Sequence, residues 1–147
     1  ELLAPHSDRY ICLDASRRVV NAATERLRVH PNVEVREGDM HALPFDDESF
    51  DLVVMMHALT YANRPAAAVA EAARVLRKGG RLLLSSLGKH AHASAVAPFG
   101  HVNLGFTQKD LQKFIEKAGL SLQDAGTVTR ERRPPHFEVI SLIGVKQ

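Results

Sequence analysis

The sequence is short of cysteine and of long apolar runs. Its 147 residues include one cysteine, Cys12, which excludes an internal disulfide framework and a cysteine-rich metal site and is typical of a reducing compartment. No apolar run approaches the length of about 20 residues that a membrane-spanning helix needs. The segment from Glu1 to Pro5 lacks the basic start and long apolar core of a signal peptide. We therefore expect a cytoplasmic protein without membrane association.

The sequence also lacks a large excess of charge of either sign. Nineteen basic and 17 acidic side chains leave a formal net charge of +2, a surplus too small to predict a nucleic-acid groove or a surface for anionic membranes. Apolar residues make up 45% of the sequence and charged residues 24%, as in ordinary folded domains. Because the length is close to the commonest size of one domain, residues 1–147 are predicted to form a single domain.

Strand-like and helix-like segments alternate along the sequence. This alternation predicts an α/β fold with a mostly parallel sheet and helices on both faces. Apolar spacing, with Ser16, Pro65 and Thr107 at helix starts, predicts three amphipathic helices. The last two strands are joined by a short polar loop, so they must form an antiparallel hairpin. The expected strands are residues 9–14, 33–36, 50–56, 81–87, 120–129 and 136–146, and the expected helices are 17–29, 65–77 and 107–118.

Three of these segments carry more specific expectations. Residues 50–56 form a nearly continuous apolar run, which predicts a central strand buried on both faces. Residues 88–105 form a long connection with three histidines, the kind of segment that serves as a functional loop or lid, with its glycines as possible hinges. Arg130–Arg133 in the hairpin loop has two interpretations: a phosphate-binding patch or, more usually, a solvated turn.

Two aspartates stand where predicted parallel strands end. Asp14 is the last residue of the first strand, at the edge where open α/β sheets bind ligands, and its carboxylate can accept hydrogen bonds from both hydroxyls of a ribose. A helix-capping aspartate is the alternative. Asp39 and Met40 follow Gly38 after the next strand, where the acid can accept from an adenine amino group and the methionine can pack on the purine. An ordinary Gly-Asp turn is the alternative there.

The order of these segments resembles class I S-adenosylmethionine-dependent methyltransferases, in particular the small-molecule branch. The resemblance runs from about residue 8 to residue 87 and rests on Leu13–Ser16, Glu37–Phe45, Ser49–Val54 and Ala73–Leu82. It implies a Rossmann-like fold, S-adenosylmethionine as cofactor and methyl transfer to a small-molecule acceptor. The family's usual proline before the paired glycines is Lys78 here, at a turn remote from the chemistry.

The resemblance also implies which residues bind the cofactor. In the family the acid that ends the second strand binds the ribose, which maps to Asp14 with Ala15 beside it. The acid after the third strand binds adenine, which maps to Asp39 with Met40. Met56 belongs to the same expected cofactor site, at the end of the next strand.

His57, Tyr61 and His101 are the remaining candidates of the site. The resemblance places His57 beside the cofactor, with His57 and Tyr61 as catalytic candidates and Tyr61 and His101 as acceptor contacts. The sulfonium leaves as a neutral thioether, so alignment and desolvation can supply most of the catalysis and a general base is optional. His57 can serve as that base because imidazole titrates near neutrality, and simple packing under the cofactor is the alternative. Met56–Leu59 stands where amino-methylating nucleic-acid enzymes carry an Asp/Asn-Pro-Pro-aromatic signature, which argues against DNA as acceptor.

One part of the family pattern has no counterpart. The glycine-rich loop after the first strand is not found, because residues 1–5 look like the last turn of the helix behind it. We therefore expect the fold to lack its first strand, and an upstream segment with a Gly-x-Gly pattern about 15 residues before Tyr10. The segment His101–Thr107 also resembles methyltransferase domains fused behind ArsR-type regulators, which implies an upstream DNA-binding domain.

Other functions stay open at this point. A nicotinamide dehydrogenase is the rival enzyme, since Asp14 would serve its ribose equally well. A cofactor-sensing or dimerising module of a transcription regulator is the non-catalytic alternative, and a homodimer is possible in either case. His90, His92 and His101 have a spacing that matches no compact metal motif, so no metal is expected.

Overall fold

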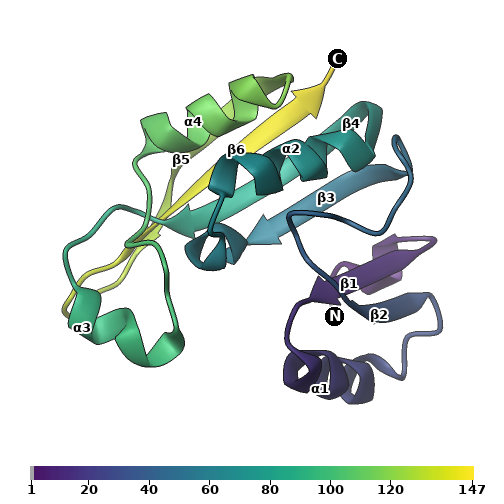
Figure 1. The fold of residues 1–147 in the computed structure, drawn as a ribbon, viewed down its shortest axis with the longest axis horizontal. Helices are drawn as coiled ribbons and strands as arrows, with labels where there is room; N and C mark the ends of the chain where they lie inside the picture. Colours follow the sequence, from purple (N-terminus) through teal and green to yellow (C-terminus); the bar gives the residue numbers. More distant parts are fainter. Residues whose placement is uncertain (1) are drawn as a thin grey trace. The chain divides into compact units, whose positions relative to one another are not determined.

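The computed structural model describes residues 2–147 and divides the chain after Pro44 into two compact units. The first unit is a β-α-β motif preceded by a short 3-10 turn (Figure 1). Its elements are η1 (Ala4–His6), β1 (Tyr10–Asp14), α1 (Arg17–Leu27) and β2 (Val33–Glu37).

Local chemistry explains the course of this first unit. β1 and β2 pair in parallel with Asp14 opposite Glu37, so both strands end at the same edge. Ser16 caps α1, as predicted, because its hydroxyl accepts from the amide nitrogen of Val19 over 3.5 Å. The side-chain amide of Asn32 donates to the carbonyl oxygens of Ala4 and Ser7 over 2.6 and 2.7 Å, which ties the first turn to the start of β2.

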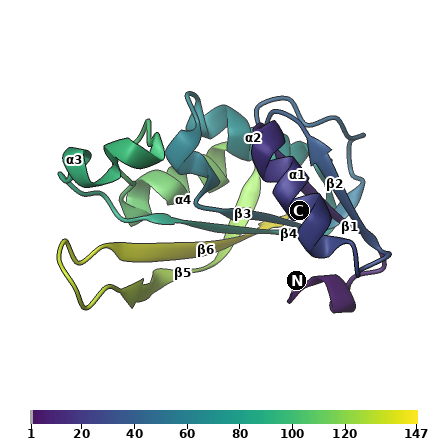
Figure 2. The same cartoon turned by 90° about the horizontal axis from the view of Figure 1, so that it is seen from below.

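The second unit holds a mixed four-stranded sheet in the order β3-β4-β6-β5. β3 and β4 are parallel, and β6 pairs antiparallel with both β4 and β5, so the predicted C-terminal hairpin is confirmed. Helices α2 and α4 contact each other and cover the same face of this sheet (Figure 2). The elements are β3 (Phe50–Met56), η2 (Ala58–Tyr61), α2 (Pro65–Val75), β4 (Leu76–Leu87), α3 (Ala93–Val96), η3 (Ala97–Phe99), α4 (Gln108–Lys117), β5 (Leu120–Arg130) and β6 (Glu138–Lys146).

The core of the second unit lies between these two helices and the sheet. α2 buries Val69 and Ala72, and α4 buries Leu111 and Ile115, at the three- and four-residue spacing of one helical face. From the sheet, the buried residues include Leu82, Leu84 and Leu142. Thr107 and Asp110 form the predicted capping box, which fixes where α4 begins.

The prediction that residues 50–56 form a central strand buried on both faces is wrong. β3 lies at an edge of the four-stranded sheet, and Leu52 and Met56 are 47% and 68% exposed while Met55 is buried. In residues 2–147 the parallel strands belong to two sheets, β1-β2 and β3-β4-β6-β5. An apolar run indicates that a strand is suited to burial, but its neighbours decide whether both faces are covered. The α/β fold class itself is confirmed.

One helix boundary also differs from the prediction. α2 ends at Val75, and the chain continues directly as β4 from Leu76, five residues before the predicted strand start at Arg81. Leu76 pairs with Phe50, and the register shifts before Leu52 pairs with Arg81. Tertiary pairing with β3 therefore extends the strand into residues whose local pattern reads as the end of a helix.

The connection between β4 and α4 is fastened at both ends. The amide of Phe106 donates to the carbonyl oxygen of Leu87 over 3.0 Å, and the amide of Lys89 donates to that of Phe106 over 3.1 Å. Gly105 has a φ of +75°, and a Cβ there would lie 2.2 Å from the carbonyl oxygen of Gly88. Gly88 and Gly105 thus make a close backbone contact. At Gly100 the φ is +71° and no atom lies within 4 Å of a built Cβ.

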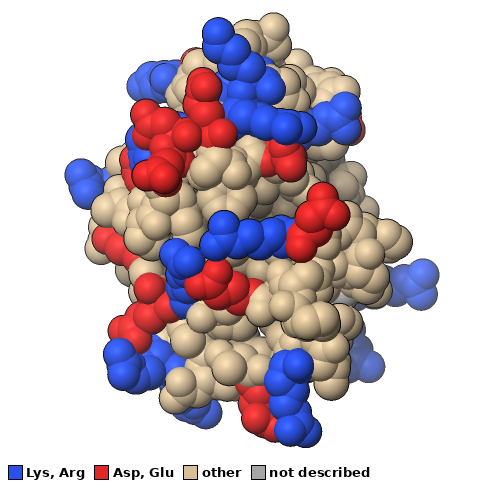
Figure 3. Space-filling model, turned by 90° about the vertical axis from the view of Figure 1, so that its right-hand side faces the viewer, with Lys and Arg blue, Asp and Glu red and all other residues tan. Residues whose placement is uncertain are grey.

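The surface carries charges of both signs. On the face shown in Figure 3, Lys and Arg side chains alternate with Asp and Glu side chains, as the small net charge predicts. None of the described helices has the length and apolar character required to cross a membrane.

Candidate functional site

The carboxyl ends of β1 and β2 are joined by a backbone hydrogen bond. The amide nitrogen of Gly38 donates to the carbonyl oxygen of Asp14 over 3.0 Å. The Asp14 carboxylate also serves the helix start, because its Oδ1 accepts from the amide nitrogen of Ser16 over 2.8 Å. The two interpretations of Asp14 are therefore compatible: one carboxylate oxygen organises the turn into α1, and the side chain stands at the ligand-binding edge of a parallel pair.

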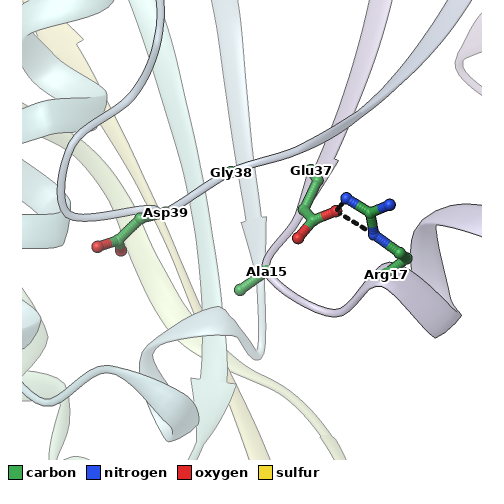
Figure 4. Close-up of a pocket in the computed structure, with 5 residues that line it drawn as sticks. All are labelled: Ala15, Arg17, Glu37, Gly38 and Asp39. Carbon is green, nitrogen blue, oxygen red and sulfur yellow. Dashed lines mark hydrogen bonds and ion pairs between the residues drawn. The ribbon is translucent and has the colours of Figure 1, made fainter.

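A shallow hollow of about 520 Å³ lies at this edge (Figure 4). We call it the strand-end pocket; it is lined by Ala15, Arg17, Glu37, Gly38 and Asp39. Arg17 and Glu37 pair at one side through two nitrogen–oxygen distances of 2.9 Å, and the Asp39 carboxylate points away from that pair (Figure 4). Small residues, Ala15 and Gly38, lie between the two acids. Asp14 is adjacent to this lining rather than part of it.

Asp39 is held by the residue two positions later. Its Oδ1 accepts from the backbone amide of His41 over 2.8 Å and lies 2.7 Å from Nδ1 of the same histidine. The His41 side chain is 12% exposed and that of Asp39 is 63% exposed. Met40 lies between them, half-buried. The turn therefore presents the acid to solvent with its orientation fixed, and His41 is a contributor that the sequence analysis missed.

In the second unit, His57 occupies a strained position directly after β3. Its φ of +55° is left-handed, a conformation that costs a non-glycine residue about 1–3 kcal/mol and is concentrated at functional sites. Its amide donates to the carbonyl oxygen of Ser85 over 2.9 Å, and its carbonyl accepts from the amide of Thr60 over 3.2 Å. These bonds hold the end of β3 to β4 and begin η2.

Tyr61 and His101 come together although 40 positions separate them in the sequence. Their rings meet edge to face with centroids 5.3 Å apart. Asn103 secures this arrangement: its side-chain amide donates to the carbonyl oxygens of Leu59 and Ala62 over 2.9 and 2.8 Å. The backbone amides of Val102 and Asn103 both donate to the carbonyl oxygen of Thr60. The connection is thereby bonded to the turn that carries Tyr61.

Several buried polar side-chain atoms have no hydrogen-bond partner. Among residues 2–147, the buried side-chain atoms that lack a hydrogen bond are Thr60 Oγ1, Ser85 Oγ, Ser86 Oγ, His90 Nε2 and His101 Nδ1. All belong to η2, the end of β4 or the connection. Unpartnered buried polar groups are rare in folded proteins and cost stability, so each of these atoms is suited to an ordered water or a polar ligand.

The candidate residues thus fall into two groups, one in each unit. Asp14, Ala15, Asp39 and Met40 lie at the β1-β2 edge, whereas Met56, His57, Tyr61 and His101 follow β3 and β4. Over the described part of the chain, no three or more histidine, cysteine or acidic side chains are arranged to hold a metal ion. Sequence reasoning missed the Arg17–Glu37 pair and Asn103, because their partners are set by the tertiary structure. It also missed His41, although the partner of His41 is Asp39, only two positions away.

Comparison with known proteins assigns the family. Residues 1–84 match the family described as "Methyltransferase domain", and this segment is more than half of the chain. The chain belongs to this family, as the resemblance to class I S-adenosylmethionine-dependent methyltransferases predicted, and S-adenosylmethionine is the family's cofactor.

Individual relatives are similar in sequence or in fold. A malonyl-[acyl-carrier protein] O-methyltransferase from Methylococcus capsulatus is 36% identical over 101 residues, which cover 63% of this chain and 37% of that protein. The chain therefore spans well under half the length of this relative.

Solved structures agree on the fold. A putative methyltransferase from Bacillus halodurans superimposes with a TM-score of 0.85 at 21% identity, covering 98% of this chain and 85% of that one. An S-adenosylmethionine-dependent methyltransferase from Methanosarcina mazei gives a TM-score of 0.78 at 18% identity over 99% of this chain and 85% of that one.

Proposed function

We propose that this chain is the part of an S-adenosylmethionine-dependent methyltransferase that holds the cofactor's nucleoside and presents a small-molecule acceptor. The observation that carries the proposal is the hydrogen bond from Gly38 to Asp14, which joins the two strand ends beside the strand-end pocket. It places two acidic turns side by side at the edge where open α/β sheets bind ligands.

The residues of this edge suit the nucleoside of the cofactor. A ribose has two vicinal hydroxyl donors and adenine has an amino donor, and carboxylates accept from such groups. Asp14 retains Oδ2 for this purpose, since the bond to Ser16 uses Oδ1. The Asp39 carboxylate is exposed beside the strand-end pocket, which the small residues Ala15 and Gly38 also line. The bound cofactor supplies the electrophilic methyl group.

The acceptor is proposed to lie at the η2 turn, against Tyr61 and His101. Tyr61, which is 48% exposed, meets the His101 ring edge to face, so the two rings form an angled aromatic corner. The unpartnered buried atoms Thr60 Oγ1 and His101 Nδ1 support a polar ligand there. Met56, which is 68% exposed, and His57 belong to the same proposal as cofactor contacts. His57 is proposed as an optional proton acceptor, because alignment and desolvation account for most of the rate of a methyl displacement.

Calorimetric titration tests the cofactor half of the proposal. The chain is titrated with S-adenosylmethionine, with its demethylated product and with NAD, and the first two are expected to bind in preference to NAD. Asp14→Ala and Asp39→Ala are expected to weaken binding, whereas Asp8→Ala, an exposed acid of the same unit, is the matched control. Preferential binding of NAD would favour the dehydrogenase instead.

A transfer assay tests the acceptor half. Metabolite pools are incubated with the chain and methyl-labelled cofactor, and label is expected in small molecules. Cofactor binding without transfer to any pool would favour a cofactor-sensing module of a transcription regulator, such as one of the ArsR type, over an enzyme.

Location and assembly complete the proposal. A cytoplasmic location is supported by the single cysteine, and the mixed surface charge supports a small-molecule partner over nucleic acid. A homodimer is the proposed assembly, which light scattering of the purified chain would test directly.

A further inference from the structure

A second hollow lies in the second unit, between the start of the long connection and the C-terminal hairpin. It has a volume of about 270 Å³ and is lined by residues 88–90, 92, 130 and 135–138. We call it the hairpin pocket. Its two sides are joined where the amide of Gly88 donates to the carbonyl oxygen of Glu138 over 2.8 Å. The pocket is therefore fixed by a backbone bond at the end of two paired strands.

One wall of the hairpin pocket consists of aromatic rings. His90 and His92 stack with centroids 5.9 Å apart, and Phe137 meets the His90 ring edge to face at 4.7 Å. The amide of His92 donates to Nδ1 of His90 over 3.2 Å, so in the neutral ring the proton is on Nε2. Burial lowers the pKa of His90, and His92 and His101 lower it further. The His90 ring is thus a flat surface whose neutral form is favoured.

The rim of the hairpin pocket is predominantly basic. Lys89 and Arg130 line it, and Glu138 is the only acid among the lining residues. Nε of Arg130 lies 3.5 Å from Oε1 of Glu138, with side chains 68% and 43% exposed. Such an exposed pair is weak, and its contact uses one of the five guanidinium N–H groups. Arg130 can therefore pair with a further anion at little cost.

We propose that the hairpin pocket binds the anionic group of a small molecule, a carboxylate or a phosphate, between Lys89 and Arg130. The ring wall of His90 and Phe137 packs against the remainder of that molecule. The volume suits a ligand of about the size of benzoate, since pockets for larger drug-sized ligands begin at about 300 Å³. This site goes beyond methyl transfer, because neither basic residue belongs to the proposed cofactor or acceptor contacts.

Nuclear magnetic resonance of the full chain without cofactor tests the site. Benzoate, benzamide and inorganic phosphate are titrated at pH 7 and constant ionic strength while backbone amides are followed. Benzoate is expected to shift the amides of Lys89–His92 and Phe137 in a saturable manner, and neutral benzamide, which has the same shape, to bind at least about tenfold more weakly. Saturation by phosphate as well assigns a general anion site, and saturation by benzoate alone assigns carboxylates.

Matched variants separate the site from general surface charge. Arg130→Gln and Lys89→Gln are each expected to weaken benzoate binding about two- to fivefold. Arg132→Gln changes an arginine of the same hairpin outside the pocket lining and is expected to leave binding unchanged. Equal binding of benzoate and benzamide, an equal loss in Arg132→Gln, or shifts that never saturate would each overturn the proposal. The readout contains no methyl transfer, so a negative transferase assay does not affect it.

Discussion

The amide nitrogen of Gly38 and the carbonyl oxygen of Asp14 lie 3.0 Å apart, and this hydrogen bond joins the turns after β1 and β2. An acidic side chain lies on each side of this bond: Asp14 itself provides the carbonyl oxygen, and Asp39 is the residue after Gly38. A Cβ at Gly38 would lie 2.8 Å from Cδ1 of Leu13, so glycine at this position avoids crowding the Leu13 side chain. The spacing of the two acids therefore depends on the backbone and not on the flexibility of their side chains.

Asp14→Ala is expected to weaken S-adenosylmethionine binding by about 1.5–3 kcal/mol, the range for hydrogen bonds to a charged group. Titration calorimetry measures the change, and Asp8→Ala provides the control. Asp14→Asn retains an acceptor oxygen for the Ser16 amide and is expected to weaken S-adenosylmethionine binding less than Asp14→Ala does. If Asp14→Ala binds the cofactor as the parent does and has a lower free energy of unfolding, Asp14 acts only at the start of α1.

Gly105→Ala is expected to lower the free energy of unfolding by more than about 2 kcal/mol, because the new Cβ combines an unfavourable positive φ with a backbone clash. That Cβ would stand 2.2 Å from the carbonyl oxygen of Gly88. Gly100→Ala is the matched control: its φ is also positive, at +71°, but its Cβ meets no atom within 4 Å. We expect a loss of about 1 kcal/mol there. Denaturant unfolding compares the two, and equal losses would contradict the close contact of Gly105 with Gly88.

Much of the architecture could be predicted because it depends on local patterns. Ser16 and Thr107 cap their helices as expected, and the hairpin follows from a loop too short for a crossover. The burial of β3 could not be predicted, since an apolar sequence does not reveal that a strand lies at an edge. The early start of β4 at Leu76 likewise depends on pairing with Phe50.

Some residues of the candidate site could likewise be predicted from local sequence, and others could not. Asp14 and Asp39 are predictable because Asp14 ends β1 and Asp39 follows the end of its parallel partner β2, and strand ends are set by local sequence. The contact of Tyr61 with His101 depends on how an 18-residue connection folds back, which no periodicity describes. Asn103 and the Arg17–Glu37 pair have no local signal at all, because their hydrogen bonds join residues 20 or more positions apart.

The capping box of α4 predicts a dependence of stability on pH. Hydrogen bonds from Thr107 hold the pKa of Asp110 below its ordinary value, so the unfolded chain binds this proton more readily than the folded one. The resulting stabilisation is complete above the ordinary pKa of the carboxyl and is lost as the pH falls through its folded value. Asp110→Asn is expected to be less stable than the parent at pH 6, with the difference shrinking towards pH 2. A difference that stays constant over this range would contradict the assignment.

Asn103→Ala is expected to loosen the contact between Tyr61 and His101. Two hydrogen bonds from the Asn103 side chain hold the carbonyls of Leu59 and Ala62, and their loss should lower the free energy of unfolding by about 1–3 kcal/mol. Asn103→Asp is expected to cost more, because a carboxylate cannot donate to a carbonyl and repels it.

Asn63→Ala, an exposed asparagine in the same region of the chain, is the control for both Asn103 variants and should leave stability unchanged. The specific readout is the nuclear Overhauser effect between the Tyr61 and His101 rings, which we expect to weaken in Asn103→Ala and to persist in Asn63→Ala. If the effect persists in Asn103→Ala despite the loss of stability, the two side-chain hydrogen bonds of Asn103 support the fold without positioning Tyr61. If it weakens, and the acceptor KM rises while cofactor affinity is unchanged, Asn103 positions the proposed acceptor surface.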